Sequence, residues 1–195
     1  MAIDSANALT TLIEAKAWLA VKPAPDTTYD NVIEKLIDSV SWQFNSFTNR
    51  LLKGRAITGY YNGNGSDTFM TPEYPINSIT SINIDSDREY GTDSLIDSDT
   101  YTYDSQGFIV LDSNTFSTSR QANKIVYDAG YTTIPYNLNV AALDQIKFLF
   151  RRHLNNQEGI STESTINGSV TVTEVGEMLT SSLEILKRYR RRDHV

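Results

Sequence analysis

The chain has 195 residues, of which 39% are hydrophobic and 21% are charged. These values are ordinary for a soluble globular protein, and the length suits one domain or one domain with an insertion. The absence of cysteine excludes disulfides, thiolate metal sites and thiol nucleophiles. No apolar run approaches the ~20 residues that span a membrane, and an acid, Asp4, stands where a signal peptide carries basic residues.

The net charge of −7 is unevenly distributed. From Lys187 to the C-terminus there are five basic residues and one acid, Asp193, so the remainder carries 12 basic and 23 acidic residues. An acidic body repels a phosphate backbone at close range. We therefore expect that the body does not grip DNA and that the basic C-terminal run is a separate feature.

The first 54 residues predict two helices. Thr11 and Glu14 have the spacing of a capping box, which begins the first helix, and the prolines within 22–25 end it. Apolar residues at three- and four-residue steps predict the second helix. They are Tyr29, Val32, Ile33, Leu36, Ile37, Val40, Phe44, Phe47 and Leu51. Asp26, Thr27 or Thr28 is expected to cap this helix, and Gly54 to end it.

Between Arg55 and Tyr131 the apolar period changes to two, which predicts strands. The predicted strands are 56–61, 68–71, 79–84, 101–103, 108–111 and 124–128. Turns are predicted at Asn62–Gly65 and Asp104–Gly107, because these residues tolerate positive φ. Most of the excess acid lies in this region, which indicates solvated loops between strands.

Helical patterns return after Pro135. Asn137 is the expected cap of a helix that is apolar on most sides and is typical of the centre of a bundle or of a subunit interface. Arg151, Arg152 and His153 fall in its last turn. A polar stretch follows, with a small hairpin predicted at 166–170, and then Ser181–Glu184 forms a second capping box that begins a final helix.

Catalytic chemistry has little basis in this sequence. The two histidines, His153 and His194, lie at a helix end and in the charged tail, and no G-x-S-x-G turn presents a serine. Two histidines without cysteine argue against a zinc site. The glycines at 59, 63 and 65 lack the Lys-Ser/Thr of a phosphate-binding loop. An enzyme that uses carboxylates needs one acid with a raised pKa, and no acid lies in an apolar stretch. We therefore expect no enzymatic activity, cofactor or metal.

One acidic run resembles the start of a calcium loop. Asp85–Glu89 places carboxylates at alternate positions, as hard cations require. Tyr90 then stands where such a loop needs glycine, and Ile96 where it needs a bidentate glutamate. A solvated acidic loop is the better interpretation.

The basic run at the C-terminus is the most informative local feature. It consists of Lys187, Arg188, Tyr189, Arg190, Arg191 and Arg192. It can complement a helix dipole, serve as a short nucleic-acid arm, or bind an acidic groove of a protein partner through the bidentate geometry of arginine. Of these three interpretations we favour protein docking.

The order of short motifs along the chain resembles the head–tail connector (head completion, adaptor) proteins of tailed bacteriophages and gene transfer agents. The motifs are AKAWL at 15–19, FTNR at 47–50, YNGNG at 61–65, PINSITSI at 75–82, VYDAGY at 126–131, IPYNL at 134–138 and LKRYRR at 186–191. The resemblance covers nearly the whole chain and rests on the order and spacing of these motifs. The large strand region places the chain with the longer members of that family.

The resemblance implies an α+β fold. Residues 1–54 and 132–195 would form a helical bundle core, and 55–131 an inserted antiparallel β region. It also implies a structural virion protein at the head–tail interface, assembled in the host cytoplasm. Subunits would form a ring, expected to be a dodecamer, beneath the portal protein, and DNA would pass through the lumen without specific binding. The ring would also provide the docking surface for the next tail component, and the C-terminal run from Lys187 to Arg192 would bind the portal.

A β-rich module that recognises carbohydrates or surfaces, with the helices as a stalk, is the alternative. It predicts that Tyr60, Tyr61, Tyr101 and Tyr103 are exposed together as one binding face. The connector interpretation instead places some of these rings in the core of the β region.

Overall fold

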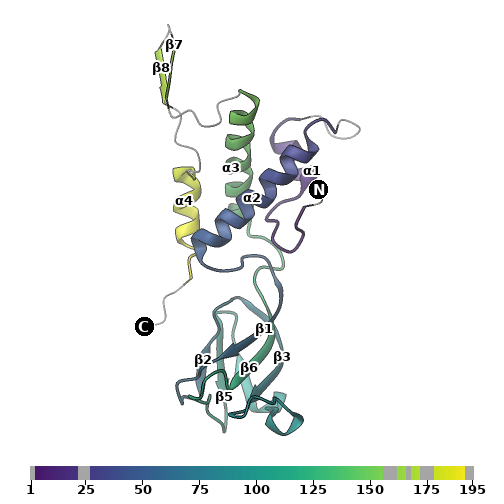
Figure 1. Cartoon of the computed structure of the whole chain (residues 1–195), viewed down its shortest axis with the longest axis vertical. Helices are drawn as coiled ribbons and strands as arrows, with labels where there is room; N and C mark the ends of the chain where they lie inside the picture. The colour runs from purple at the N-terminus through teal and green to yellow at the C-terminus, as the bar shows by residue number, and fades with distance from the viewer. Residues whose placement is uncertain (1–2, 22–26, 156–161, 166–167, 172–177, 192–195) are drawn as a thin grey trace. The chain divides into compact units, whose positions relative to one another are not determined.

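The computed structural model describes residues 3–21, 27–155, 162–165, 168–171 and 178–191. The chain divides into two compact units (Figure 1). The helical unit consists of Met1–Asn49 and Ile134–Val195, and the β unit of Arg50–Thr133. The fold is therefore a mixed α+β arrangement in which the β unit lies between two helical segments of the sequence.

Four α-helices occur in the described part of the helical unit. They are α1 (Leu12–Trp18), α2 (Asp30–Thr48), α3 (Tyr136–Leu154) and α4 (Thr180–Lys187). Between α3 and α4, β7 (Thr162–Thr165) and β8 (Gly168–Thr171) pair as an antiparallel hairpin. Of the hairpin predicted at 166–170, residues 166 and 167 lie outside the described residues.

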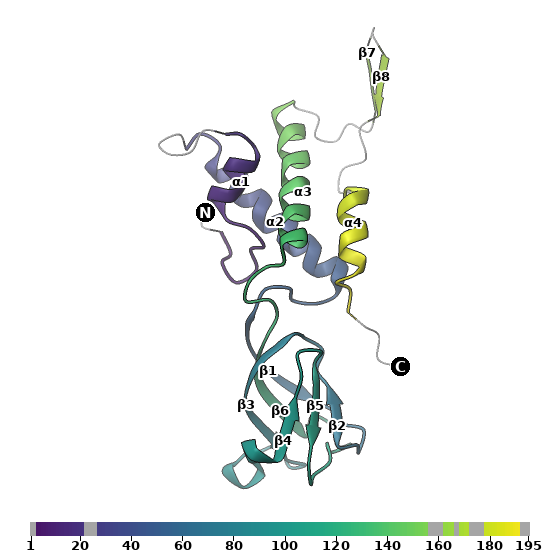
Figure 2. The same cartoon turned by 180° about the vertical axis from the view of Figure 1, so that it is seen from behind.

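The predicted helical bundle core is wrong. A bundle needs helices of similar length that run within about 20° of one another, whereas α1 and α4 have 7 and 8 residues and α2 and α3 have 19 each. The short helices are only about 10–12 Å long, at 1.5 Å per residue. In addition, α2 crosses α3 obliquely (Figures 1 and 2). Apolar periodicity identifies the buried face of a helix, but it does not fix the angle at which that face crosses its neighbour.

Like α2, α3 contacts each of the other three helices. Its buried apolar residues are Leu138, Ala141, Ala142, Leu143, Ile146 and Phe150. They meet apolar residues of α2 such as Ile33, Ile37 and Val40, which are fully buried. Tyr29 packs edge-on against Phe150, with 5.4 Å between the ring centroids.

The residues before α1 form an ordered arm, which the sequence patterns did not predict. Leu9 is 1% exposed. Its amide donates to Ser41 Oγ of α2 at 3.1 Å, and its carbonyl accepts from Asn139 Nδ2 of α3 at 3.1 Å. Further along, Asn45 Nδ2 donates to Asn7 Oδ1 at 3.3 Å. The arm is therefore held mainly by polar contacts, which leave no periodic apolar signal.

The capping box at the start of α1 is confirmed. The Glu14 amide donates to Thr11 Oγ1, and the Thr11 amide donates to Glu14 Oε2, both at 3.2 Å. The Thr10 hydroxyl also donates to Glu14 Oε2, at 2.8 Å. This bond is the largest of several that stabilise the anion and hold the pKa of Glu14 below its usual value. An ion pair of 2.6 Å between Lys16 and Asp30 then fixes α1 to α2.

The predicted end of α2 and the predicted caps of α3 and α4 are wrong. α2 ends at Asn49, whose φ of 53° is left-handed, and not at Gly54. This position accepts asparagine because its short polar side chain tolerates that conformation. α3 begins directly after Pro135, so Asn137 lies inside the helix, and the predicted box at 181–184 is absent because α4 already begins at Thr180. α2, α3 and α4 have no side-chain cap.

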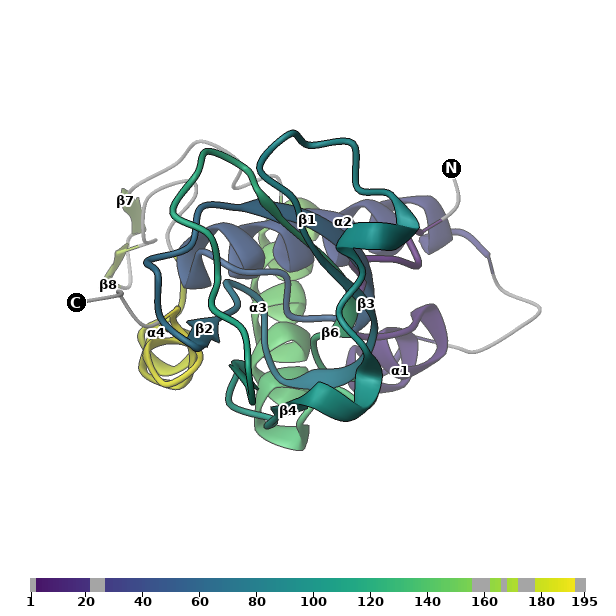
Figure 3. The ribbon, with the colours of Figure 1, turned by 90° about the horizontal axis from the view of Figure 1, so that it is seen from below.

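The β unit consists of two three-stranded antiparallel sheets. The first contains β1 (Arg55–Tyr61), β6 (Asn123–Ala129) and β3 (Ile76–Ile84), and the second β2 (Thr68–Met70), β5 (Phe108–Leu111) and β4 (Tyr101–Tyr103). β6 lies between β1 and β3 (Figures 1 and 3), and β5 lies between β2 and β4 (Figure 2). All six strands match strands predicted from the two-residue period, to within three residues at each end.

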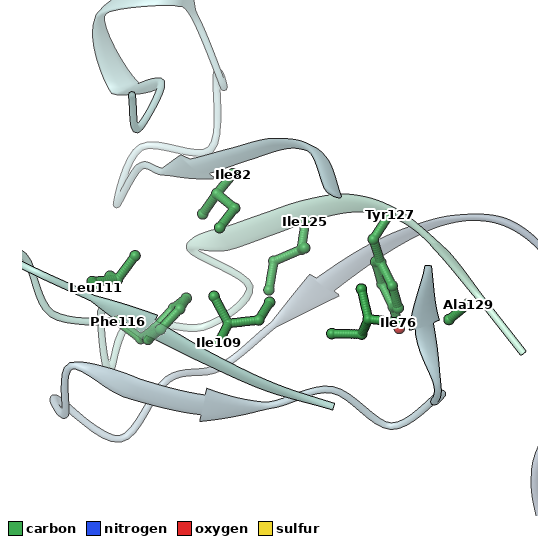
Figure 4. Close-up of a cluster of buried hydrophobic side chains, with 8 residues drawn as sticks. All are labelled: Ile76, Ile82, Ile109, Leu111, Phe116, Ile125, Tyr127 and Ala129. Atoms are coloured by element: carbon green, nitrogen blue, oxygen red, sulfur yellow. The ribbon is translucent and has the colours of Figure 1, made fainter. Parts of the chain in front are cut away.

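One core joins the two sheets (Figure 4). Its buried members are Ile76, Ile82, Ile109, Leu111, Phe116, Ile125, Tyr127 and Ala129. Alternate residues of β6 point into this core, as expected for a strand with one buried face. Phe116 enters it from the loop after β5 and packs against Phe69, with 5.2 Å between the ring centroids.

The two chain segments at the base of the β unit are paired with each other. The Tyr131 amide donates to Leu52 O at 2.8 Å, and the Gly54 amide donates to Tyr131 O at 3.0 Å. Gly130 makes this approach possible: its φ is +102°, and a Cβ there would lie 2.8 Å from the Lys53 carbonyl. The unit is thus closed by its own backbone.

The buried hydroxyl of Tyr127 leads to a prediction about alkaline pH. It lies 3.0 Å from the Tyr61 hydroxyl, and burial, followed by this contact, raises the pKa of Tyr127 above its usual value of 10.0. A raised pKa means that the folded state holds the proton more tightly than the unfolded chain, so stability is present below about pH 10 and falls above it. Tyr127→Phe should weaken this fall, although the lost hydrogen bond costs about 1 kcal/mol at neutral pH.

The measurement is urea unfolding at pH 7 and pH 10.5, followed by near-ultraviolet circular dichroism. Tyr103→Phe is the control, because it removes a hydroxyl from a ring that is 43% exposed. Equal losses of stability in Tyr127→Phe and wild type between the two pH values would contradict the prediction.

Glu14 leads to a prediction about acid. Because the pKa of Glu14 is lowered in the folded state, its contribution is present above the unfolded value of 4.5 and is lost as the pH falls through the folded value. Glu14→Gln should lower stability by about 0.5–1 kcal/mol at pH 7 and reduce its dependence on pH between 5 and 3. Helix unfolding at 222 nm measures this, with Glu89→Gln in an exposed loop as the control.

Candidate docking site

The predicted docking residues follow α4, so the packing of this helix decides where they lie. Leu186 is fully buried. Ser182 Oγ donates to Ala141 O at 3.2 Å, and the Leu179 amide donates to Gln145 Oε1 at 2.9 Å. Both acceptors belong to α3. The start and middle of α4 are therefore anchored on α3.

The segment Lys187–Arg191 returns to the body of the helical unit. The Tyr189 hydroxyl donates to Asn137 Oδ1 at 2.6 Å, and the Arg191 amide donates to Thr48 O at 2.8 Å. These five residues are therefore attached to the helical unit and do not form a detached tail. Arg192 lies outside the described residues.

The segment presents its cations unequally. Lys187, Arg188 and Arg190 are exposed, whereas Tyr189 and Arg191 are half-buried. Lys187 Nζ lies 2.7 Å from Glu184 Oε1, and this neighbour holds the pKa of Glu184 below its usual value. The structure thus brings three of the predicted site residues to the surface and uses two to hold the segment in place.

The helix-dipole interpretation also has a structural basis. The last carbonyls of a helix lack partners within it and carry partial negative charge. The Arg191 amide satisfies one of them, Thr48 O, and α2 has no basic residue in its own last turn. The basic segment therefore lies beside the negative end of α2 as well as in the last turn of α4. No sequence pattern indicated its position beside α2.

The acidic loop at Asp85 is organised by its own backbone. The Asp85 carboxylate accepts from the amides of Asp87 at 2.8 Å, Glu89 at 3.0 Å and Tyr90 at 2.8 Å. These bonds, that from Tyr90 first, lower the pKa of Asp85. The carboxylate thus stabilises a turn. Among the described residues there is no group of three or more His, Asp or Glu placed to hold a metal ion.

The shifted carboxyl groups of the described residues are all stabilised as anions. They are Glu14, Asp85 and Glu184. A carboxyl that acts as a general acid at neutral pH needs a shift in the opposite direction. His153 is exposed on the last turn of α3, and His194 lies outside the described residues. No described helix is long and apolar enough to cross a lipid bilayer.

The four tyrosines of the recognition-module alternative do not form one face. Tyr61 and Tyr101 pack against the core of the β unit. Tyr60 and Tyr103 are exposed, but they lie on strands of different sheets. The binding face on which that alternative depends is therefore not formed by these residues.

One family model and several solved structures are similar to this chain. The family model for "Head completion protein" matches residues 8–192. A solved chain from the neck of an empty gene transfer agent particle is 12% identical, with a TM-score of 0.62 over 100% of this chain and 95% of that chain. A chain from the virion of a native gene transfer agent particle is 11% identical, with a TM-score of 0.62 and the same coverage.

A third solved chain, from the neck of a native particle, is 12% identical, with a TM-score of 0.57 over 97% of this chain and 96% of that chain. At these identities the structures show a shared fold, whereas the family model covers nearly the whole sequence. No curated protein matches. The chain therefore belongs to the head completion protein family, and the structural role at the head–tail connection of the virion that its sequence predicted is confirmed.

Proposed function

We propose that this chain forms a ring beneath the portal protein, extends the DNA channel and receives the next tail component. Family membership supports this proposal. The necks that contain chains of the same fold were obtained with C6 and C12 symmetry, which supports a ring and, more narrowly, a ring of twelve copies. In this proposal residues 1–54 and 132–195 form the connector core, and 55–131 form the insertion.

The observation that carries the docking mechanism is the state of the C-terminal segment. Arg188 and Arg190 are exposed on a segment whose backbone is fixed by Tyr189 and Arg191. Fixing the segment before binding lowers the entropic cost of association. Arginine binds carboxylates through two parallel hydrogen bonds, so the portal surface that it fits is an acidic groove.

The charge of the remainder suits a channel that DNA crosses. Without the residues from Lys187 on, the chain carries 12 basic and 23 acidic residues. A surface of this sign repels phosphates. DNA would therefore pass the ring without being held.

Removing the exposed arginines tests the docking mechanism. Arg188→Gln combined with Arg190→Gln should weaken binding to the portal at least tenfold, because each lost charged contact costs about 1–3 kcal/mol. Arg88→Gln combined with Arg120→Gln removes two exposed charges from the β unit and serves as the matched control. Co-sedimentation measures the affinity, and negative-stain microscopy shows whether rings form on the portal. Unchanged binding of the first variant would exclude this mechanism.

The attachment of the segment can be tested without the portal. Tyr189→Phe removes the hydrogen bond to Asn137 and should accelerate tryptic cleavage after Lys187 and Arg188 several-fold, because cleavage requires local opening. Tyr136→Phe is the control, since that ring is 81% exposed. Mass spectrometry of a digestion time course gives the rates, and equal rates for both variants would show that the phenol does not hold the segment.

A further inference from the structure

The outer face of the sheet β2-β5-β4 carries exposed apolar side chains. β5 is the middle strand, with Ile109 and Leu111 in the core and Phe108 and Val110 on the opposite face. Phe108 is 38% exposed and Val110 36%. Residues in the middle of a sheet reach such exposure only where no other element covers that face. Met70 stands opposite Phe108 in the strand register and enlarges the apolar area.

The outer face of the other sheet has the ordinary composition. On its middle strand, β6, the outward residues are Lys124, Val126 and Asp128. Thr58 and Ser81 stand opposite Val126. A sheet with one solvated face normally places polar residues on that face. The apolar outer face of β5 thus differs from the polar outer face of the other sheet in the same unit. Exposed apolar patches of this kind mark interaction sites.

Exposed acids flank each of the three strands of this sheet. Asp67 directly precedes β2, Asp104 directly follows β4 and Asp112 directly follows β5, and all three are exposed. Between positions 56 and 119 the sequence has ten acids and one basic residue, Arg88. Arg88 lies in the loop after β3, which is a strand of the other sheet.

This combination excludes several occupants. Two copies cannot meet face to face through this surface, because like charges would oppose each other, and nucleic acid and anionic lipid carry the same sign as its rim. The surface that fits is that of a protein with exposed apolar side chains surrounded by Lys and Arg. Such an interface has the usual plan of an apolar centre and a polar rim.

We propose that the outer face of β2-β5-β4, formed by Thr68, Met70, Thr102, Phe108 and Val110, is the surface that binds the next tail protein. This inference rests on the proposed connector function and assigns the tail-facing contact to one sheet. The partner contributes a basic surface with an apolar centre. The C-terminal segment binds the portal in the proposed function. The portal and the tail protein are thus bound by surfaces of opposite charge.

The lack of cysteine makes a direct test possible in assembled particles. Val110→Cys introduces the only thiol of the chain, and labelling with a maleimide in the 21.9-kDa band reports on that position alone. Particles that carry this variant are prepared with tails and, from cells lacking the next tail protein, without tails. We expect at least tenfold less labelling in tailed particles, relative to labelling after denaturation. Thr58→Cys, on the outer face of the other sheet, should label equally in both.

Each alternative outcome has its own meaning. Equal labelling of Val110→Cys with and without tails would overturn the assignment of this face but leave the connector function intact. Protection in tailless particles would mean that the head or another copy of the chain covers the face, which also overturns it. If neither variant is found in particles at all, while both fold, the connector function itself fails.

Charge reversal provides a second and independent readout. Asp112→Lys should lower the fraction of particles that hold tails several-fold, because it places a cation on the rim that meets a basic partner. Asp87→Lys makes the same change in the loop after β3 and should have no effect. Equal tail attachment in the two variants, counted by electron microscopy, would exclude an electrostatic contribution from this rim.

Discussion

The burial of α3 among α1, α2 and α4 is the constraint on which the helical unit depends. α3 carries polar side chains beside its buried apolar residues, and several of them each hold a different element. Asn139 binds the N-terminal arm, Asp144 accepts from Trp18 Nε1 of α1 at 3.0 Å, and Gln145 binds the start of α4. Asn137 binds the C-terminal segment. Because these contacts share one helix, the arm, α1, α4 and the segment Lys187–Arg191 keep a fixed arrangement.

The sequence predicted the strands of the β unit well and the helix arrangement poorly. Strand pairing in the β unit depends on a two-residue period and on turns such as that at Gly107, whose φ is +99°, and both are visible locally. Helix packing depends on crossing angles, which short motifs do not encode. The end of α2 and the cap of α3 were misplaced for a related reason. Asn49 ends α2 and Pro135 precedes α3 through backbone conformation, without the side-chain cap that sequence rules seek.

The sequence predicted which residues make up the candidate site but not how they are arranged. Five basic residues after position 186 are evident in the sequence. That Tyr189 and Arg191 bind the helical body is not evident, because their partners, Asn137 and Thr48, belong to other helices and have no pattern that marks them. The apolar outer face of β5 was likewise hidden, since a run of four apolar residues does not reveal which side of the strand is covered.

The backbone closure at the base of the β unit has a consequence for how such proteins can change. The two strands that enter and leave the unit are joined by Leu52, Gly54 and Tyr131, all within the unit itself. The two points at which the chain enters and leaves the β unit therefore have a fixed separation, whatever the rest of the β unit contains. An insertion closed in this way can be enlarged, shortened or exchanged for another without shifting the register of any helix. Under the assignment proposed above, the face that binds the tail protein can therefore change while the helical unit stays the same.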